Sequence, residues 1–540
     1  MMISLMACPL FLQAEEQNSE QPNDQSEANR QIKENRNKPG NPKCALLLPR
    51  SPSPILRRGT ERIQAACSYS ADLFHGRSID DPLLKDYDWA LILKQIKTAA
   101  GRTLPDDAWA VSISGDRPKK ISIEAKTGRA QLFAMYHIAR CLELNKPYAE
   151  WPISRKPVVP MRYAWISAGN NSSPVLRTDW FEHDVAELPS MGYNGILLNC
   201  NNTQGTSIGR QTIPLKLTPK GVMVDRFKLP AFLQLFDKLK SYGLDICLYH
   251  QAYVPPGYDP DDVRACYAGK RKLPGLLKAI RESSYELASK IFTTMPQVDS
   301  LFHHSVECPW MWEGGVSIFP CENEKAAESA FDAYLTGLTK ACREHGRDLM
   351  FWTHVSGISA RQLRSIHRVL DRHPSVIVIE DHVWPNSAWA YSPIMGHVHE
   401  NILRKTTAGR WGMTIVTTDG EFYGAGALPT AYPQPHIRSA RTMVERDAEC
   451  GIVRINPQAM TPFSTLQDCN AINVIATAEE WWAKPRPLEE QWHDWCASRF
   501  GTSAAKAVVS ALKQSETIIK KGLSASGLPL LDHSALLVHP

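Results

Sequence analysis

Two glutamates of this 540-residue chain stand at the ends of apolar, strand-like runs, where their carboxyl groups could do acid–base chemistry. Glu307 closes the run SLFHHSVE and is followed by the rings of Trp310 and Trp312. Glu421 follows the run MTIVTT, inside the glycine-rich stretch TTDGEFYGAG. Apolar rings disfavour the charged form of a nearby carboxyl and raise its pKa, as a general acid requires. Because a second carboxylate can activate water or attack carbon, such a pair is typical of glycosidic bond hydrolysis.

Two aspartates are alternatives for the second carboxylate. Asp381 ends the apolar run SVIVIED, and Asp419 lies two residues before Glu421. An aspartate before a glycine often holds a turn through its own side chain, which is our interpretation of Asp419. Each glutamate also has a structural alternative, an ion pair with an arginine or lysine of a neighbouring loop. We predict Glu307 as the acid, Glu421 as its partner and Asp381 as a further catalytic candidate.

Other polar and aromatic residues stand at the ends of the remaining apolar runs or just beyond them. We predict the following substrate contacts: Trp165, Asn199, Asn201, His250, His303, His354, Trp310, Tyr423 and Arg454. His303 and His304 alternate along one strand, so only one can face a barrel interior, and either can be a hydrogen-bonded core histidine. The fifteen tryptophans could act as flat apolar platforms for sugars, although core filling explains tryptophans equally well.

Short apolar runs and amphipathic helices alternate through most of the chain and would position these groups. The runs are 162–167, 194–199, 245–250, 300–307, 348–355, 375–381, 413–418 and 450–456. The helices between them are predicted at 180–191, 229–242, 276–294, 323–345, 360–372, 397–408 and 434–447. Eight strands with intervening helices favour a (β/α)8 TIM barrel, whose functional residues gather at the C-terminal strand ends. A doubly wound sheet is the alternative.

The barrel is flanked by regions of different composition. Residues 43–153 contain the strand-like CALLLP, AWAVSISG and KKISIEAK and the helical GRAQLFAMYHIARCLEL, which together predict a small α/β domain. Residues 154–470 would form the barrel, and 471–540 a short helical C-terminal region. The predicted fold class is therefore α/β, with a small N-terminal α/β domain, a TIM barrel and a helical C-terminal region.

Residues 1–42 form an apolar leader followed by a polar tether that we expect to be disordered. The first fourteen residues resemble a secretory signal, and LMAC resembles a lipoprotein cleavage site with Cys8 as the acceptor. We therefore expect export to a periplasmic, extracellular or lipid-anchored location.

The composition argues against several classes of function. A net charge of +5 is small for this length and gives no reason to expect a nucleic-acid partner. No later stretch is apolar enough to span a membrane. The thirteen cysteines form no CxxC pair and no Cys/His cluster with zinc spacing, and no GxGxxG opens a helix. We predict no metal or organic cofactor, mostly buried free thiols, and an oligosaccharide or polysaccharide substrate; the oligomeric state is left open.

Four stretches resemble the α-glucuronidases of glycoside hydrolase family 67: MGYNGILLNCNN, LFHHSVECPW, GEFYGAG and NVIATAEEWWAKPRPLEEQWHDWCASRFG. The resemblance implies a glycosidase in which Glu307 is the acid and Glu421 is a catalytic carboxylate. KKISIEAKTGRAQLFAMYHIARCLE resembles the small N-terminal domain that this family shares with family 20 hexosaminidases. It implies an enzyme that removes a terminal or side-chain sugar from polysaccharide fragments.

The chain departs from the family 67 pattern at the lysines that help to hold the uronate carboxylate. His303 stands where the family has a lysine four residues before the acid. After the sixth strand, Asp381 stands where the family has its second lysine, and Asn386 stands roughly where the family has a catalytic aspartate. Arg454, after a β-branched run, is our candidate for a substitute clamp. Arg162 opens the first strand, and we expect it at the opposite, stabilising face of the barrel.

Two alternatives to this interpretation stay open, one of them a second glycosidase family and the other a binding protein. Family 20 hexosaminidases use an aspartate–glutamate pair at the fourth strand, whereas Val306 precedes Glu307 here and argues against substrate-assisted chemistry. The changed sixth-strand positions also suit a carbohydrate-binding barrel that has lost catalysis.

Overall fold

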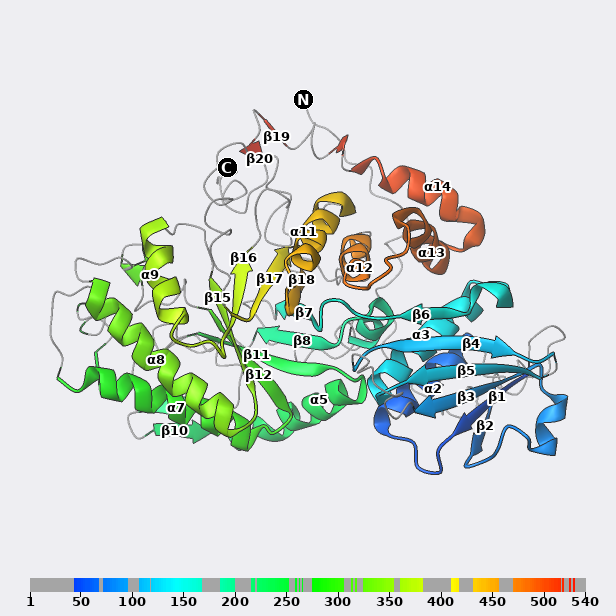
Figure 1. Ribbon diagram of the computed structural model, residues 1–540, viewed down its shortest axis with the longest axis horizontal. Helices are drawn as coiled ribbons and strands as arrows, with labels where there is room; N and C mark the ends of the chain where they lie inside the picture. Colours follow the sequence, from blue (N-terminus) through cyan, green and yellow to red (C-terminus); the bar gives the residue numbers. More distant parts are fainter. Residues whose placement is uncertain are drawn as a thin grey trace, which may run out of the picture.

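The chain folds into a closed barrel with a small sheet domain on one side and a group of C-terminal helices next to both (Figure 1). The structure is a computed structural model and describes residues 43–67, 71–95, 106–116, 118–167, 185–199, 215–218, 221–251, 258–259, 262, 265, 274–304, 312–313, 316–317, 324–353, 360–381, 409–416, 431–455, 470–515, 517–518, 524–525 and 528–529. This architecture confirms the predicted fold class.

Six strands of the N-terminal domain form one sheet in the order β2-β1-β3-β5-β4-β6. Their bounds are β1 Cys44–Leu48, β2 Ala71–His75, β3 Trp89–Gln95, β4 Trp109–Ser114, β5 Lys119–Ala125 and β6 Ile153–Arg155. The predicted hairpin is β4 and β5, and Gly115 in its turn has a φ of 75°, which glycine adopts without strain. The strands β2, β3 and β6 extend the sheet beyond what the alternation predicted.

Two helices cover one face of this sheet, α2 (Pro54–Ala66) and α3 (Gly128–Glu143). Each begins at a hydroxyl side chain that accepts from a free backbone N–H of the first turn. Ser53 Oγ accepts from Leu56 N at 3.4 Å, and Thr127 Oγ1 accepts from Ala130 N at 3.1 Å. The helical periodicity of residues 128–144 predicted α3, whereas no predicted helix corresponds to α2. Short 3-10 helices, η1 (Pro82–Asp86) and η2 (Tyr148–Glu150), complete the domain.

Eight parallel strands close into the barrel, in the order β7-β8-β11-β12-β15-β16-β17-β18. Their bounds are β7 Met161–Ser167, β8 Gly195–Asn199, β11 Asp245–Gln251, β12 Val298–His304, β15 Asp348–Thr353, β16 Ile377–Asp381, β17 Trp411–Val416 and β18 Cys450–Ile455. All eight coincide with predicted strands. β18 pairs with β7 and closes the ring, which rules out the doubly wound sheet because that sheet has two open edges.

Side chains alternate between the barrel interior and the layer under the helices, as the two-residue period of a strand requires. On β7, Tyr163 and Trp165 belong to the interior cluster, whereas Ala164 and Ile166 pack outward. Gly195 leaves room for the interior: a Cβ there would lie 2.2 Å from a Tyr163 ring atom. The interior is therefore a filled core rather than an open channel.

Five described helices surround the strands: α5 (Leu229–Ser241), α7 (Leu276–Thr294), α8 (Glu324–Glu344), α9 (Ala360–Leu370) and α11 (Pro433–Glu445). They match the predicted segments, and the predicted helix at 397–408 lies outside the described residues. Of the predicted helix 180–191, residues 185–187 are α-helical and Leu188–Met191 form the 3-10 helix η4. The antiparallel pair β9 (Leu215–Thr218) and β10 (Gly221–Val224) was not predicted. Two-residue strand pairs occur at β13 (Trp312–Glu313) with β14 (Val316–Ser317) and β19 (Ser524–Ala525) with β20 (Leu528–Pro529).

The C-terminal helices are α12 (Ala471–Glu479), α13 (Leu488–Phe500) and α14 (Thr502–Leu512). Between α12 and α13, Trp482 enters the core of the N-terminal domain, where its ring contacts Phe133 at 6.2 Å. The guanidinium of Arg162 lies 4.8 Å from the Trp482 ring centroid. Gly192, with a φ of 88°, makes room for this ring, because a Cβ there would lie 2.8 Å from it. Trp482 therefore links the C-terminal region to both α3 of the N-terminal domain and β7 of the barrel.

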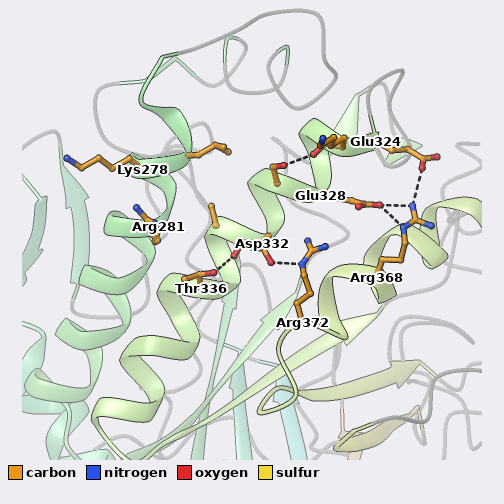
Figure 2. Close-up of a pocket in the computed structure, with 12 residues that line it drawn as sticks. Lys278, Arg281, Glu324, Glu328, Asp332, Thr336, Arg368 and Arg372 are labelled. Atoms are coloured by element: carbon orange, nitrogen blue, oxygen red, sulfur yellow. Dashed lines mark hydrogen bonds and ion pairs between the residues drawn. The ribbon is translucent and has the colours of Figure 1, made fainter.

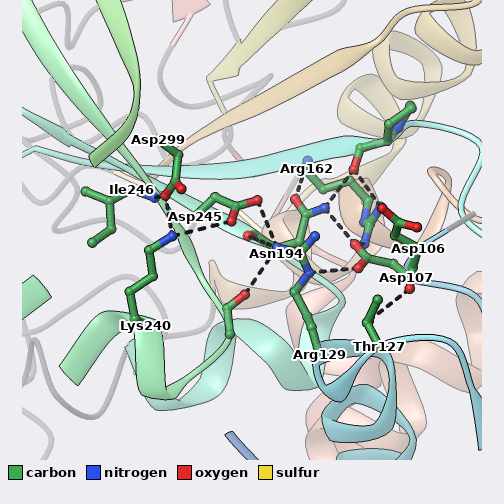
Figure 3. A network of polar contacts seen from close by, with 12 residues as sticks. Asp106, Asp107, Thr127, Arg129, Arg162, Asn194, Lys240, Asp245, Ile246 and Asp299 are labelled. Atoms are coloured by element: carbon green, nitrogen blue, oxygen red, sulfur yellow. Dashed lines mark hydrogen bonds and ion pairs between the residues drawn. The ribbon is translucent and has the colours of Figure 1, made fainter. Parts of the chain in front are cut away.

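A buried polar network ties the N-terminal domain to the start of the barrel strands (Figure 3). Asp107 accepts from Arg162 Nη2 at 2.8 Å, Arg129 Nε at 2.7 Å and Asn194 Nδ2 at 2.7 Å. Arg129 also donates to Asp245 Oδ2 at 2.8 Å. Burial alone would raise the pKa of Asp107, but the charges of Arg162 and Arg129 outweigh it and hold that pKa below its usual value. The expected position of Arg162 at this face is confirmed.

This network has a direct consequence for the location of a functional site. Arg162, Asn194 and Asp245 all stand at or just before the first residues of their strands. The N-terminal domain therefore contacts the barrel where β7, β8 and β11 begin, and the C-terminal ends of these strands point away from this joint. The C-terminal end of the strands is where (β/α)8 barrels carry their sites.

Candidate active site

The described residues nearest the C-terminal strand ends form an aromatic cluster inside the barrel. The Trp165 ring lies 5.6 Å from Tyr249, 5.6 Å from Phe302 and 5.1 Å from Trp352, measured between centroids. The last contact is edge to face, an arrangement that aromatic quadrupoles favour. Trp165, Tyr249 and Trp352 are each at most 5% exposed. We call Trp165, Tyr249, Phe302 and Trp352 the aromatic floor of the candidate site.

Arg454 lies over this floor. Its guanidinium carbon is 5.1 Å from the centroid of the Trp165 ring, and the side chain is partly exposed. Strand register places Arg454 opposite Trp165 on one side and opposite Val416, the last residue of β17, on the other. A cation over an indole face is held by the ring quadrupole without losing its ability to donate hydrogen bonds at its edge. Arg454 can therefore present a fixed positive charge at the barrel mouth.

The catalytic candidates follow directly from three strands of this ring. β12 ends at His304, three residues before Glu307, and β17 ends at Val416, five residues before Glu421. Asp381 is the last residue of β16 and pairs in register with Thr414 of β17. In the barrel order β12 and β17 are separated by β15 and β16, so their C-terminal ends lie on different sides of the mouth.

Several predicted site residues lie where the structure makes no statement about side chains. Outside the described residues are Glu307, Glu421, Asn201, His354, Trp310 and Tyr423. For Asn199, His250 and Asp381 the structure describes the backbone, as the strand ends of β8, β11 and β16. Their predicted roles stay predictions.

His303 is corrected from a substrate contact to a core residue. It is fully buried, and its Nδ1 lies 3.1 Å from the Tyr334 hydroxyl of α8. Its ring stacks at 5.3 Å on Phe351, an outward-facing residue of β15. His303 therefore packs between the barrel wall and α8, on the opposite side of β12 from the interior Phe302. The alternation of the strand allowed this outcome, and only the position of α8 decided it.

Trp165 is corrected from a predicted substrate contact to part of the interior. A platform needs an open ring face, whereas Trp165 is 3% exposed and packs against Tyr249, Phe302, Trp352 and Arg454. Its indole Nε1 is buried with no hydrogen-bond partner among the described residues. Trp165 therefore supports Arg454 instead of exposing a face to solvent.

Sequence reasoning missed Tyr249, Phe302, Trp352 and Thr414, all of which point into the barrel. Each lies within an apolar run, where a ring or a threonine is not distinctive. The signal that could have found them is the two-residue alternation of a strand: once one residue of a strand is placed inside the barrel, the residues two positions away lie inside as well.

A hollow lies on the outside of the barrel, between α7, α8 and α9 (Figure 2). Its volume is about 830 Å³, and its walls carry Lys278, Arg281, Glu324, Glu328, Asp332, Arg368 and Arg372. Arg368 Nη2 lies 2.6 Å from Glu328 Oε1, and Arg372 Nε lies 2.9 Å from Asp332 Oδ1. Burial would raise the pKa of Glu328, but hydrogen bonds from Ser365 and Arg368 lower it. A carboxylate held in its charged form is a poor general acid, so this hollow is not our candidate for catalysis.

Within the described residues, no group of three or more His, Cys, Asp or Glu side chains could hold a metal ion. In the same part of the chain, no helix has the length and apolar character needed to cross a membrane.

No protein-family model matches the chain, and no curated protein matches it. Among solved structures, the fold of this chain is similar to that of a protein described as a "GH138 enzyme targeting pectin rhamnogalacturonan II". The TM-score is 0.58 and the identity 13%, over 89% of this chain and 56% of that one. The chain thus spans a little over half the length of that protein.

The chain is also similar to a GH20 exo-β-N-acetylglucosaminidase from Vibrio harveyi in complex with N-acetylglucosamine. Here the TM-score is 0.50 and the identity 11%, over 88% of this chain and 75% of that one. At such low identities the likeness concerns the fold. The chain therefore has a fold that is found in solved glycoside hydrolases of families GH138 and GH20.

Proposed function

We propose that this protein is a glycoside hydrolase that removes a terminal or side-chain sugar from polysaccharide fragments. The observation that carries the proposal is the C-terminal end of the barrel, where a supported arginine and an aromatic floor lie beside strands that lead to three carboxylates. The fold found in glycoside hydrolases supports the proposal. Hydrolysis of a glycosidic bond needs a protonated carboxylic acid and a second carboxylate on either side of the bond that is cleaved.

In this proposal Glu307 protonates the leaving oxygen, and Glu421 activates water or attacks the anomeric carbon. Their strands, β12 and β17, are separated by two strands around the barrel, which supports approach to the scissile bond from two sides. Asp381, at the end of the intervening β16, is the alternative for the second role.

We propose further that the sugar is a uronide, as in α-glucuronidases. Arg454 supports this part, because a buried carboxylate needs a charge-assisted donor and a guanidinium can bind it in a bidentate manner. Trp165 supports the guanidinium from below at 5.1 Å. One structural neighbour is described as targeting pectin rhamnogalacturonan II, so fragments of that polysaccharide are candidate substrates together with xylo-oligosaccharides that carry uronic acids.

The test is a hydrolysis screen of the full-length protein. The substrates are aryl glycosides of neutral sugars, uronides and N-acetylhexosamines, followed by uronic-acid-bearing xylo-oligosaccharides and rhamnogalacturonan II fragments. We expect release of a single terminal sugar, and loss of release in Glu307→Gln and Glu421→Gln. Glu282→Gln is the matched control, because Glu282 is an exposed residue of α7 on the outer surface. Activity that survives both glutamate changes would overturn the assignment.

A carbohydrate-binding barrel without catalysis is the second candidate, favoured by the replacement of both family 67 lysines. It predicts that the wild-type protein and Glu307→Gln bind the same oligosaccharide with equal affinity and that neither releases a product. Isothermal titration calorimetry combined with product analysis separates the two candidates. Preferential hydrolysis of an N-acetylhexosaminide would instead favour a family 20-like activity.

A further inference from the structure

Two cysteines of the N-terminal domain lie in direct contact although they are far apart in the sequence. The Sγ atoms of Cys44 and Cys67 are 3.3 Å apart. Cys44 opens β1, the first strand of the domain, and Cys67 caps the C-terminus of α2. The two are 0% and 4% exposed and belong to the core cluster that lies between the sheet and its helices.

The surrounding elements hold this contact in place from both sides. The Cys67 backbone N–H donates to Ile63 O at 2.9 Å, which ties it to the last turn of α2. Cys44 is in register with Ala71 of β2 and with Trp89 of β3, so its backbone is fixed between two strands. A disulfide bond needs the sulfur atoms at about 2.05 Å, and in the structure they lie 3.3 Å apart. The sulfur atoms would therefore have to approach by about 1.2 Å, inside the core cluster to which both cysteines belong.

We propose that Cys44 and Cys67 are a disulfide-forming pair that links β1 to the end of α2. The oxidant is a small disulfide such as oxidised glutathione. One thiolate attacks the small disulfide, which gives a mixed disulfide and releases one small thiol. The second thiolate then attacks the protein sulfur of the mixed disulfide, forms the Cys44–Cys67 bond and releases a second small thiol. Two protein thiols are oxidised and one small disulfide is reduced to two thiols.

The order of attack follows from the different burial of the two thiols. Burial, with the neighbouring Cys67, raises the pKa of the Cys44 thiol far above its usual value, which leaves very little thiolate at that position. Cys67 is slightly exposed and stands at a helix end, where opening of the last turn costs less than opening of a strand. Cys67 therefore reacts first, and Cys44 closes the bond.

The bond would close a loop that contains the whole of α2. Linking the ends of such a loop lowers the conformational entropy of the unfolded chain, so the folded domain gains stability. A Cys44–Cys67 disulfide bond is also consistent with the export that the apolar leader predicts, because disulfide bonds persist in oxidising compartments. The inference is independent of the proposed glycosidase activity, because the pair lies in the N-terminal domain and not at the barrel mouth.

The test uses the full-length protein and oxidised glutathione as the oxidant. The protein is incubated with glutathione mixtures of rising oxidised fraction, unfolded in N-ethylmaleimide, digested and analysed by mass spectrometry. We expect a linked peptide pair that contains Cys44 and Cys67, lighter by two hydrogen atoms than the sum of the reduced peptides and absent after treatment with dithiothreitol. Full alkylation of both cysteines at the highest oxidised fraction would overturn the proposal, as would a link from either one to another cysteine.

Thermal unfolding gives the second measurement. The oxidised protein is expected to melt a few degrees above the reduced protein. The difference should disappear in Cys44→Ala and Cys67→Ala and persist in Cys496→Ala, a buried cysteine of the C-terminal helices. If an alanine variant does not fold, the peptide map of the wild-type protein still decides. Equal melting of linked and reduced wild-type protein would refute the structural role of the bond.

Discussion

Arg454 is the residue on which the proposed uronide specificity depends most. Its position has two local causes, the strand register that sets it opposite Trp165 and the indole face 5.1 Å away. The stem of an arginine packs as an apolar group while its head carries the charge. Replacing it with methionine therefore separates the two contributions.

We predict that Arg454→Met raises the KM for a uronide about tenfold or more and changes the KM for a neutral glycoside much less. A lost charge-assisted hydrogen bond costs about 1.5–3 kcal/mol, and 1.4 kcal/mol corresponds to a factor of ten. Steady-state kinetics on paired aryl uronide and aryl glycoside substrates measures this. Arg372→Met, in the outer hollow, is the control and should leave both KM values unchanged. An unchanged uronide KM in Arg454→Met would contradict the clamp.

Glu307 is tested by the dependence of its variant on the leaving group. A general acid matters most when the leaving oxygen is basic, because an activated phenol leaves without protonation. Glu307→Gln should therefore reduce kcat strongly, by about a hundredfold or more, on an oligosaccharide and only weakly on a nitrophenyl glycoside. Glu282→Gln should behave as the wild type on both substrates. Equal losses on both substrates would rule out the acid role.

At the scale of elements, the joint between the N-terminal domain and the barrel depends on a buried ion pair. Asp107 is 3% exposed and neutralises Arg162, which is fully buried on β7. The pair also holds Asn194 before β8 and Arg129 of α3. Asp107 thus joins its own segment to three others: β7, the residue before β8, and α3.

We predict that Asp107→Asn destabilises the protein by about 3–5 kcal/mol, because it leaves the Arg162 charge buried without a counter-ion. The result would be a fall in melting temperature of several degrees, measured by calorimetry. The neighbouring Asp106 is the matched control: its side chain is 66% exposed and its ion pair with Lys126 lies at the surface, so Asp106→Asn should cost less than about 1 kcal/mol. Equal effects of the two variants would show that the network does not hold the joint.

At the scale of the whole molecule, buried histidines set how stability depends on pH. Burial lowers the pKa of His436 to about 3, and lowers the pKa values of His137 and His367 to about 4. Their value in the unfolded chain is near 6.5. Between pH 6.5 and these lower values the unfolded chain binds more protons than the folded one. Stability is therefore complete above pH 6.5 and is lost as the pH falls.

We predict that the melting temperature decreases steadily when the pH is lowered from 7 to 5. His436 is fully buried on α11, with no hydrogen-bond partner for either ring nitrogen within the part of the chain that the structure describes, and stacks on Tyr432 at 5.6 Å. His436→Leu removes one titrating group and should reduce the loss between pH 7 and 5 by on the order of 2 kcal/mol. Melting curves at several pH values measure this. An identical pH profile in the variant would show that His436 does not contribute.

The sequence by itself determined the barrel, because the two-residue period of a strand and the 3.6-residue period of a helix are local properties. The eight apolar runs between 162 and 456 became the eight barrel strands, and five predicted helices became α5, α7, α8, α9 and α11. The ends of those runs also indicated Arg454 as a cation at the barrel mouth, because the residue type at the end of a predicted strand is read directly from the sequence.

Only the tertiary structure decided which neighbour each side chain meets. Alternation left His303 open between the interior and the wall, and the hydroxyl of Tyr334 on α8 placed it in the wall. Nothing local links Asp107 to Arg162, or Cys44 to Cys67, since these contacts form when separate elements pack together. The physical reason is that a periodic pattern specifies which face of an element is apolar. Chain topology then specifies what that face packs against.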